Sequence, residues 1–278
     1  MERITLHYAE AGTGDQLVVL LHGFPEFWYS WRHQLKDLAA AGYTVVAPDM
    51  RGYNLSDKPA DVSAYEIEEL VQDVSDLIEH LGFEKAVVIG HDWGAGVAWA
   101  FSQRKPEMLT KLASLQVPPP SIWKKNQTVS QFLASWYMFF FQLPWLPELM
   151  LTSSDFRKLA IALKTTTAEK GVFSDEDVAL YKKAWSQEGA ITGGLNYYRA
   201  NILKRMFGKG IPPKKIDVPT LFIYGEQDHA VLPQTVANTG DIVSGEYREL
   251  RIPESGHWVQ NEARETVSAT LIEFLSDG

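Results

Sequence analysis

Continuous apolar runs and helical patterns alternate along most of this chain. Four short runs, mostly of valine, isoleucine and leucine, occupy residues 17–21, 44–47, 86–89 and 220–224. Runs without polar interruption are typical of strands that are buried on both faces of a sheet. Residues 66–81 carry apolar side chains at every third or fourth position, which predicts an amphipathic helix. The order strand, helix, strand predicts a parallel sheet.

The middle of the chain has a different pattern. Residues 118–213 contain no buried-strand runs, but they contain helical patterns rich in tryptophan, tyrosine and phenylalanine, with proline clusters at both ends. The earlier alternation then returns, with a strand predicted at 247–252 and a final amphipathic helix at 262–275. We therefore predict an α/β domain formed by residues 1–117 and 214–278, with a helical lid inserted between its two parts.

One stretch of the predicted lid has the apolar character of a membrane segment. Residues 132–151 contain a single charged residue, Glu148. Proline and glutamine residues interrupt the stretch, and its longest unbroken apolar piece, 136–141, is far shorter than the roughly 20 residues that a bilayer helix needs. We therefore predict no membrane span and assign this stretch to a lid over an apolar pocket.

Composition and charge exclude several classes of function. The 278 residues are 45% hydrophobic, as in folded globular proteins, and the net charge of −9 disfavours binding to nucleic acid. Without cysteine the chain has no disulfide, no thiolate metal ligand and no cysteine nucleophile. The sequence shows neither metal-ligand spacing nor a glycine-rich nucleotide loop, so we expect no metal and no other cofactor. Its first residues do not resemble a secretory signal, which predicts a cytoplasmic protein.

The strongest chemical motif follows the strand predicted at 86–89. Gly90-His91-Asp92-Trp93-Gly94 leads into a helical pattern at 95–103. Small residues around one reactive residue allow the tight strand-to-helix turn called a nucleophile elbow, which exposes the central side chain. Here that side chain is Asp92 rather than a serine. An aspartate needs no base to deprotonate it near neutral pH, and its carboxylate can attack carbon directly.

Three further motifs follow predicted strands. His22-Gly23-Phe24-Pro25 follows the first, and the main-chain N–H groups of Phe24 and Trp93 are candidates for holding an oxyanion. Asp228 and His257 follow two of the later strands. The chain order of nucleophile, acid and histidine is that of the α/β-hydrolase fold.

The polar residues beside these motifs are predicted to have other roles. Glu226 is an alternative to Asp228 as the acid. His22 and His91 flank the two turns, and we interpret them as hydrogen-bonded structural residues. Asp49 and Arg51 are expected to pair and brace a loop.

These motifs together resemble the epoxide hydrolases of the α/β-hydrolase superfamily. The resemblance is carried by residues 22–32, 49–53 and 90–94, extends over nearly the whole chain and is weakest in the lid. It implies that Asp92 opens an epoxide and forms a covalent alkyl ester. It further implies that His257, oriented by Asp228, activates the water that hydrolyses this ester to release a vicinal diol.

The resemblance also implies two lid tyrosines that protonate the epoxide oxygen. By register these are Tyr198, chosen over its neighbour Tyr197, and Tyr137. The expected partners are a small apolar epoxide and water, and the chain is expected to be a monomer or a homodimer. Aromatic residues of the turns and the lid are expected to contact the substrate, namely Phe24, Trp93, Trp136, Phe141 and Trp258.

Two alternatives remain open. Haloalkane and haloacid dehalogenases are similar and use the same aspartate nucleophile, but haloalkane dehalogenases hold the halide with a side-chain N–H donor where this chain has Phe24. Fluoroacetate dehalogenases carry arginines at the elbow, where this chain has Trp93 and Gly96. A non-catalytic ligand receptor on the same fold is the alternative of another class, and it predicts a missing catalytic group. The sequence leaves open the particular epoxide and the regiochemistry.

Overall fold

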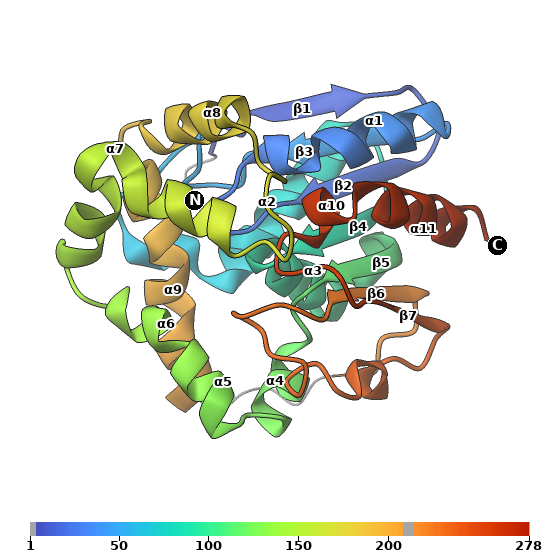
Figure 1. Cartoon of the computed structure of the whole chain (residues 1–278). Coiled ribbons are helices and arrows are strands. Elements are labelled where there is room, and N and C mark those ends of the chain that lie inside the picture. The colour runs from blue at the N-terminus through green and yellow to red at the C-terminus, as the bar shows by residue number, and fades with distance from the viewer. Residues whose placement is uncertain (1–3, 208–213, 278) are drawn as a thin grey trace.

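A seven-stranded sheet with helices on both faces forms the centre of the molecule (Figure 1). The computed structural model describes residues 4–207 and 214–277. Neighbouring strands pair in the order β1-β3-β2-β4-β5-β6-β7, and every pair is parallel except β1 with β3. The strands are β1 (Tyr8–Ala11), β2 (Leu17–Leu21), β3 (Thr44–Pro48), β4 (Ala86–His91), β5 (Leu109–Leu115), β6 (Thr220–Gly225) and β7 (Tyr247–Ile252).

Helices connect the strands and form an insertion between β5 and β6. The α-helices are α1 (Arg32–Ala40), α2 (Ile67–His80), α3 (Trp93–Arg104), α4 (Pro120–Lys125), α5 (Val129–Ala134), α6 (Trp136–Phe140), α7 (Leu146–Thr165), α8 (Asp175–Trp185), α9 (Ala190–Phe207), α10 (Val259–Glu262) and α11 (Arg264–Ser276). Short 3₁₀ helices are η1 (Trp28–Trp31), η2 (Val62–Tyr65), η3 (Pro106–Met108) and η4 (Thr239–Ile242).

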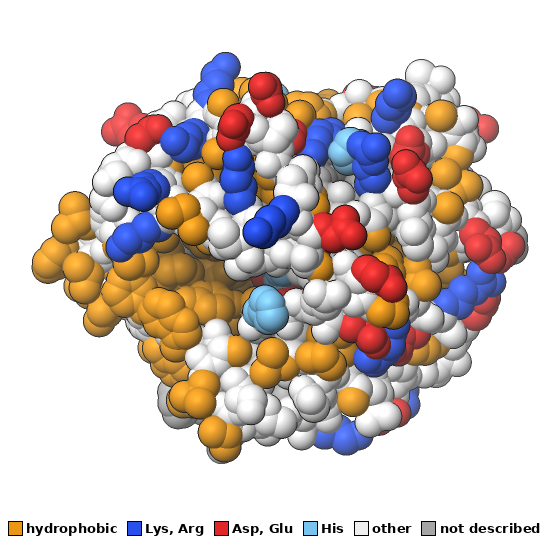
Figure 2. All heavy atoms as spheres, viewed as in Figure 1, with side chains coloured by type: hydrophobic (Ala, Val, Ile, Leu, Met, Phe, Trp, Pro, Cys, Tyr) orange, Lys and Arg blue, Asp and Glu red, His pale blue; other side chains and the backbone are white. Residues whose placement is uncertain are grey.

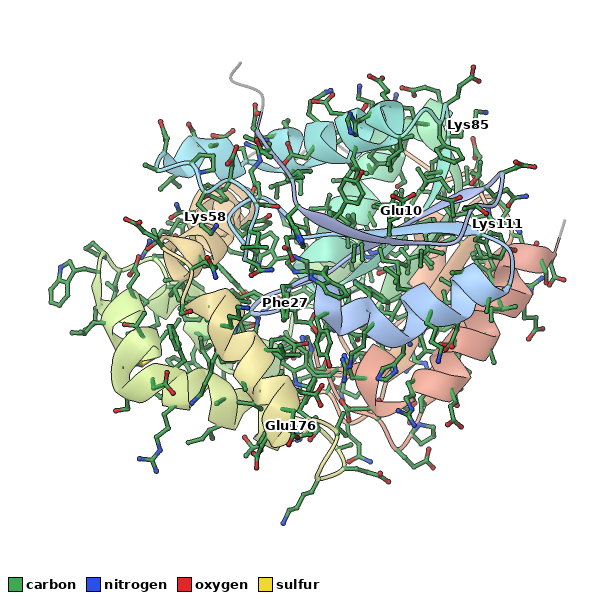
Figure 3. The ribbon with its side chains drawn as sticks, turned by 90° about the horizontal axis from the view of Figure 1, so that it is seen from above. Glu10, Phe27, Lys58, Lys85, Lys111 and Glu176 are labelled. Atoms are coloured by element: carbon green, nitrogen blue, oxygen red, sulfur yellow. The ribbon has the colours of Figure 1, made fainter. Side chains whose placement is uncertain are left out.

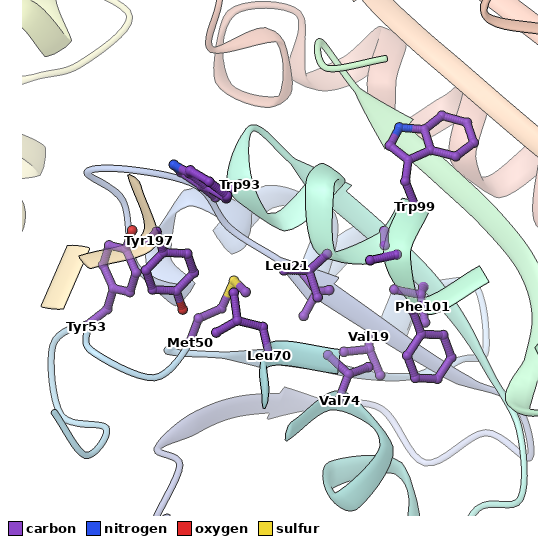
Figure 4. Packing of buried hydrophobic residues seen from close by; sticks show 14 of the residues in the cluster. Val19, Leu21, Met50, Tyr53, Leu70, Val74, Trp93, Trp99, Phe101 and Tyr197 are labelled. Atoms are coloured by element: carbon purple, nitrogen blue, oxygen red, sulfur yellow. The ribbon is translucent and has the colours of Figure 1, made fainter. Parts of the chain in front are cut away.

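The sheet is buried on both faces because alternate side chains of a strand point to opposite sides. In β2, Val19 and Leu21 pack in the cluster that contains Leu70 and Val74 of α2 (Figure 4). Val18 and Leu20, on the other face, pack in the cluster that contains residues of α1 and α11. The predicted parallel, doubly covered sheet is therefore confirmed.

The last helix predicted at 262–275 is confirmed as α11, and Ala263, with φ of −115° and ψ of 42°, separates it from α10. One local expectation differs from the structure. Asp49 and Arg51 do not pair with each other. The Arg51 guanidinium instead donates from Nε to Asp73 of α2 at 2.6 Å, while Asp49 accepts from Asn54 at 2.8 Å. Each side chain thus finds a partner that the local sequence does not indicate.

Helices α4 to α9 form a lid at the end of the sheet where the parallel strands terminate (Figure 1). Phe27, labelled in Figure 3, lies at the junction, where its ring packs edge-on against Tyr181 of α8 with centroids 5.2 Å apart. The indole N–H of Trp185 donates to the carbonyl of Pro25 at 2.6 Å. Buried aromatic packing and buried hydrogen bonds therefore attach the lid to the turn after β2.

The outer surface of the lid is strongly apolar. Figure 2 shows apolar side chains gathered on the left, where the lid helices lie, beside a hollow in the surface. Within the described ranges, no helix has both the length and the apolarity to cross a bilayer. The large apolar residues most exposed on α5 to α7 and their connections are Val129, Phe132, Leu133, Trp136, Leu143, Trp145, Leu149 and Ile161.

Candidate active site

Asp92 lies in a strained turn between β4 and α3. Its φ of 51° and ψ of −116° are unusual for a residue with a side chain. A Cβ on Gly90 would lie 2.2 Å from the carbonyl oxygen of Gly94, and one on Gly94 would lie 2.1 Å from that of Leu21. Both glycines are therefore required by close backbone contacts, and the strain is typical of a functional site.

The turn after β2 holds the Asp92 carboxylate. The N–H of Phe24 donates to Asp92 Oδ1 at 2.9 Å. A Cβ on Gly23 would lie 2.3 Å from the Cβ of Asp92, so only glycine allows this approach. Trp93 is the first residue of α3, so its N–H has no hydrogen-bond acceptor within the helix. Of the two amides expected to hold an oxyanion, that of Phe24 thus binds Asp92 from another turn, and that of Trp93 follows Asp92 in the chain.

His257 lies between two carboxylates. Its Nδ1 is 2.7 Å from Asp228 Oδ2, and its Nε2 is 3.8 Å from Asp92 Oδ2. Burial disfavours the imidazolium, but the charge and hydrogen bond of Asp228 outweigh it, with a contribution from Asp92, and raise the pKa of His257 to about 9. The structure therefore brings together the three residues that the sequence motifs place after separate strands.

Asp228 is buried and fully hydrogen-bonded, whereas the alternative acid is not. Burial acts to raise the pKa of Asp228, but His257 and the N–H groups of Ala230 and Val231 outweigh it and lower this pKa. Glu226 is exposed, and its nearest cation is Arg251 at 3.8 Å. Asp228, not Glu226, is the carboxylate paired with His257.

Aromatic side chains from the turns and the lid surround Asp92. The Tyr198 ring lies 5.1 Å from Trp93 and 5.1 Å from Phe141, centroid to centroid, and 6.1 Å from Tyr137. Burial, and after it the nearby Asp92 carboxylate, raise the pKa of Tyr137 and that of Tyr198 above the usual tyrosine value. Both hydroxyls therefore stay protonated at neutral pH and can act as proton donors.

The structure distinguishes Tyr198 from its neighbour. The hydroxyl of Tyr197 donates to the carbonyl of Arg51 at 2.8 Å, away from Asp92. The Tyr198 ring instead packs edge-on against Phe24, with centroids 5.6 Å apart. Successive residues of helix α9 point in different directions, which explains why only one of the two faces the carboxylate.

Trp136 is not among the residues around Asp92. It is 60% exposed, and its ring packs against Phe140, whereas Tyr137 packs against the buried Phe141. In a helix, residues four apart share a face, so Tyr137 and Phe141 point inward together, whereas Trp136 points outward. The expectation that Trp136 contacts substrate is not supported by this placement.

Trp258 supports His257 from the side. Its ring lies edge-on to the imidazole at a centroid distance of 4.8 Å, and its indole N–H donates to Thr166 of the lid at 2.8 Å. The side chain is buried and packs against His257, and its contact with substrate stays a prediction.

Two buried polar groups near the site were not assigned a function from the sequence. Gln116 is fully buried, and its amide donates to Asp228 and accepts from the N–H of Gly225. Glu26 pairs with His91, whose other ring nitrogen bonds the carbonyl of His257 at 2.8 Å. The available signal for Gln116 is a polar residue directly after an apolar strand, as for Asp92.

His91 has the hydrogen-bonded structural role predicted for it, and so does His22. Nδ1 of His22 bonds the Gly23 carbonyl, and its Nε2 accepts from the N–H of Met50 at 3.0 Å. Within the described residues, no group of three histidine or carboxylate side chains is arranged to hold a metal ion.

Comparison with known proteins identifies the family. The profile of a family described as alpha/beta hydrolase fold matches residues 16–263. The AB hydrolase superfamily protein YfhM of Bacillus subtilis is 42% identical over 99% of this chain and 95% of its own. Epoxide hydrolase 1 of Caenorhabditis elegans is 39% identical over 99% of this chain and 69% of its own.

Solved structures agree with the sequence matches. A Bacillus megaterium epoxide hydrolase in complex with an inhibitor matches with a TM-score of 0.88 at 31% identity, covering 99% of this chain and 98% of its own. The chain belongs to the α/β-hydrolase fold family. The predicted resemblance to epoxide hydrolases is also confirmed, because similar relatives and structures carry that name.

Proposed function

We propose that this protein is an epoxide hydrolase that converts an apolar epoxide to a vicinal diol through a covalent ester on Asp92. The observation that carries the proposal is an aspartate at the nucleophile elbow, held by the Phe24 amide and facing His257, beneath two lid tyrosines. The names of similar proteins support the same reaction. No metal or organic cofactor is needed for this chemistry.

The first step opens the ring. An oxygen of the Asp92 carboxylate attacks one ring carbon, and the bond between that carbon and the epoxide oxygen breaks. The oxygen gains a proton from Tyr137 or Tyr198, whose hydroxyls are protonated donors in a buried aromatic site. The product of this step is a hydroxyalkyl ester of Asp92 and a tyrosinate.

The second step hydrolyses the ester. His257 takes a proton from water, whose oxygen attacks the carbonyl carbon of the ester, and Asp228 stabilises the resulting imidazolium. The oxyanion of the tetrahedral intermediate is stabilised by the N–H groups of Phe24 and Trp93. Collapse releases the diol and the Asp92 carboxylate, and the proton on His257 returns to the tyrosinate.

The rate of ester hydrolysis is expected to rise with pH and then level off. Only neutral His257 can accept the proton, and its pKa is about 9 in the free protein. Esterification removes the negative charge of Asp92, which contributes to that value, so the pKa in the ester is expected to lie below 9. Diol release in a single turnover, followed between about pH 5 and pH 10, measures this pH dependence of ester hydrolysis. Release that is independent of pH over this range contradicts a general-base role for His257.

The reaction itself is tested with two substrates and no added metal or cofactor. Purified protein is given styrene oxide or, separately, 1-bromobutane, and diol and bromide are measured. Diol without bromide is the expected result, because Phe24 offers no side-chain N–H to a halide. Bromide without diol supports a dehalogenase instead. If neither diol nor bromide forms, the result supports the receptor alternative.

A further inference from the structure

We propose that Glu262 is a positioning residue that fixes the loop carrying His257 and attaches a segment of the lid, residues 166–168, to it. The catalytic consequence rests on the proposed function, because it assumes that His257 acts in ester hydrolysis. The structural part, a carboxylate that joins two loops, stands on contacts alone.

One carboxylate binds the residues on both sides of His257. Glu262 ends α10, and its Oε2 accepts the N–H of Gly256 at 2.9 Å while its Oε1 accepts the N–H of Trp258 at 2.9 Å. Hydrogen bonds to an ionised acceptor are among the stronger ones in proteins. The peptide groups before and after the catalytic histidine are therefore held by the same side chain.

The lid contributes a third donor to this carboxylate. The N–H of Ala168, in the loop after α7, donates to Glu262 Oε2 at 2.7 Å. A Cβ on Gly256 would lie 3.0 Å from the carbonyl oxygen of Thr166 and 3.2 Å from the nitrogen of Ala168. The lid segment thus lies directly against the backbone of the histidine loop. The bond from the Trp258 indole to Thr166 joins the same two segments.

These contacts distinguish Glu262 from an ordinary surface ion pair. Among the side chains that the structure describes, no lysine or arginine nitrogen forms a salt bridge with it. All three of its partners are backbone donors, and a carboxylate offers only acceptors. A glutamine of the same size must present its NH₂ group to at least one of those donors, so it cannot reproduce the arrangement.

The test compares Glu262→Gln with Glu265→Gln in the full-length protein. Glu265 is the matched control because it lies close by on α11 with a 91% exposed side chain. Hydrogen–deuterium exchange is followed in peptides covering residues 164–172 and 254–262. We expect exchange about tenfold faster in both peptides of Glu262→Gln and unchanged exchange in the control. Equal exchange in the two variants overturns the proposal, whatever reaction the protein catalyses.

Kinetics then test the consequence for His257. With styrene oxide, Glu262→Gln is expected to form the Asp92 ester at a rate within about twofold of the unmodified protein and to hydrolyse it about 10- to 100-fold more slowly. Equal slowing of both steps contradicts a role through His257. Absence of diol from the unmodified protein refutes the proposed function and leaves the exchange result to decide the structural claim.

A second variant covers the case in which Glu262→Gln does not fold. Thr166→Val removes the acceptor of the Trp258 indole and leaves Glu262 in place. It is expected to speed exchange in residues 164–172 by about threefold and to slow ester hydrolysis more than ester formation. Exchange and kinetics like those of the unmodified protein contradict attachment of the lid at this loop.

Discussion

Replacing His257 with glutamine is expected to stop diol release while leaving ester formation on Asp92 intact. The imidazole accepts a proton only in the second step, and loss of a general base costs about 10²- to 10⁴-fold. Glutamine is close in size but is not a base. Rapid-quench measurement of substrate consumption and diol release with styrene oxide checks the prediction. Substrate is expected to fall by one equivalent per protein and then stop.

Two control variants define the result. Asp92→Ala lacks the nucleophile and is expected to lose both steps, at least about 10⁴-fold in turnover. His80→Gln makes the same change at the exposed end of α2 and is expected to retain full activity. Multiple turnovers by His257→Gln at the unmodified rate contradict the assignment of the base.

Removing both lid hydroxyls is expected to abolish ring opening. Tyr137 and Tyr198 lie close enough to Asp92 for its charge to raise their pKa values, and the departing epoxide oxygen needs a proton. Each single change to phenylalanine is expected to lower kcat/KM for styrene oxide about 10- to 100-fold, because the other tyrosine still donates. The double variant is expected to lose about 10⁴-fold. Steady-state diol formation measures all three.

Tyr197→Phe is the matched control for these variants. It removes a neighbouring buried hydroxyl that donates to the Arg51 carbonyl and not toward Asp92. It is expected to lower the free energy of unfolding by about 1–3 kcal/mol, because that carbonyl loses its donor, and to keep activity. Activity lost equally in Tyr197→Phe and Tyr198→Phe contradicts a specific proton-donor role for Tyr198.

The sheet and the meeting of Asp92, Asp228 and His257 could be predicted because their sequence signals are local. A strand buried on both faces has to be apolar throughout, so residues 17–21 and 220–224 stand out in the sequence. The elbow requires glycines within a few positions of Asp92, and Asp228 lies three residues after the end of β6. Side chains that follow parallel strands meet at one end of the sheet, which brings these residues together.

Other features depend on partners distant in the chain and carry no local signal. Glu262 binds backbone N–H groups, which every residue except proline has, and one of them belongs to Ala168. Trp136 and Tyr137 are adjacent aromatics, and only the rotation of the short helix α6 decides which one points inward. Arg51 pairs with Asp73 of α2 rather than with Asp49, which is nearer in the sequence. The partners and orientations of these side chains depend on tertiary packing.

The most direct test of the central claim is the intact mass of His257→Gln after mixing with styrene oxide. A covalent ester on Asp92 predicts a mass gain of one epoxide per protein, located by peptide mapping to the fragment containing Asp92. The double variant Asp92→Ala with His257→Gln is expected to show no gain. Two results contradict the covalent mechanism. One is no mass gain of His257→Gln under conditions in which the protein without substitutions forms diol, and the other is an adduct on a residue other than Asp92.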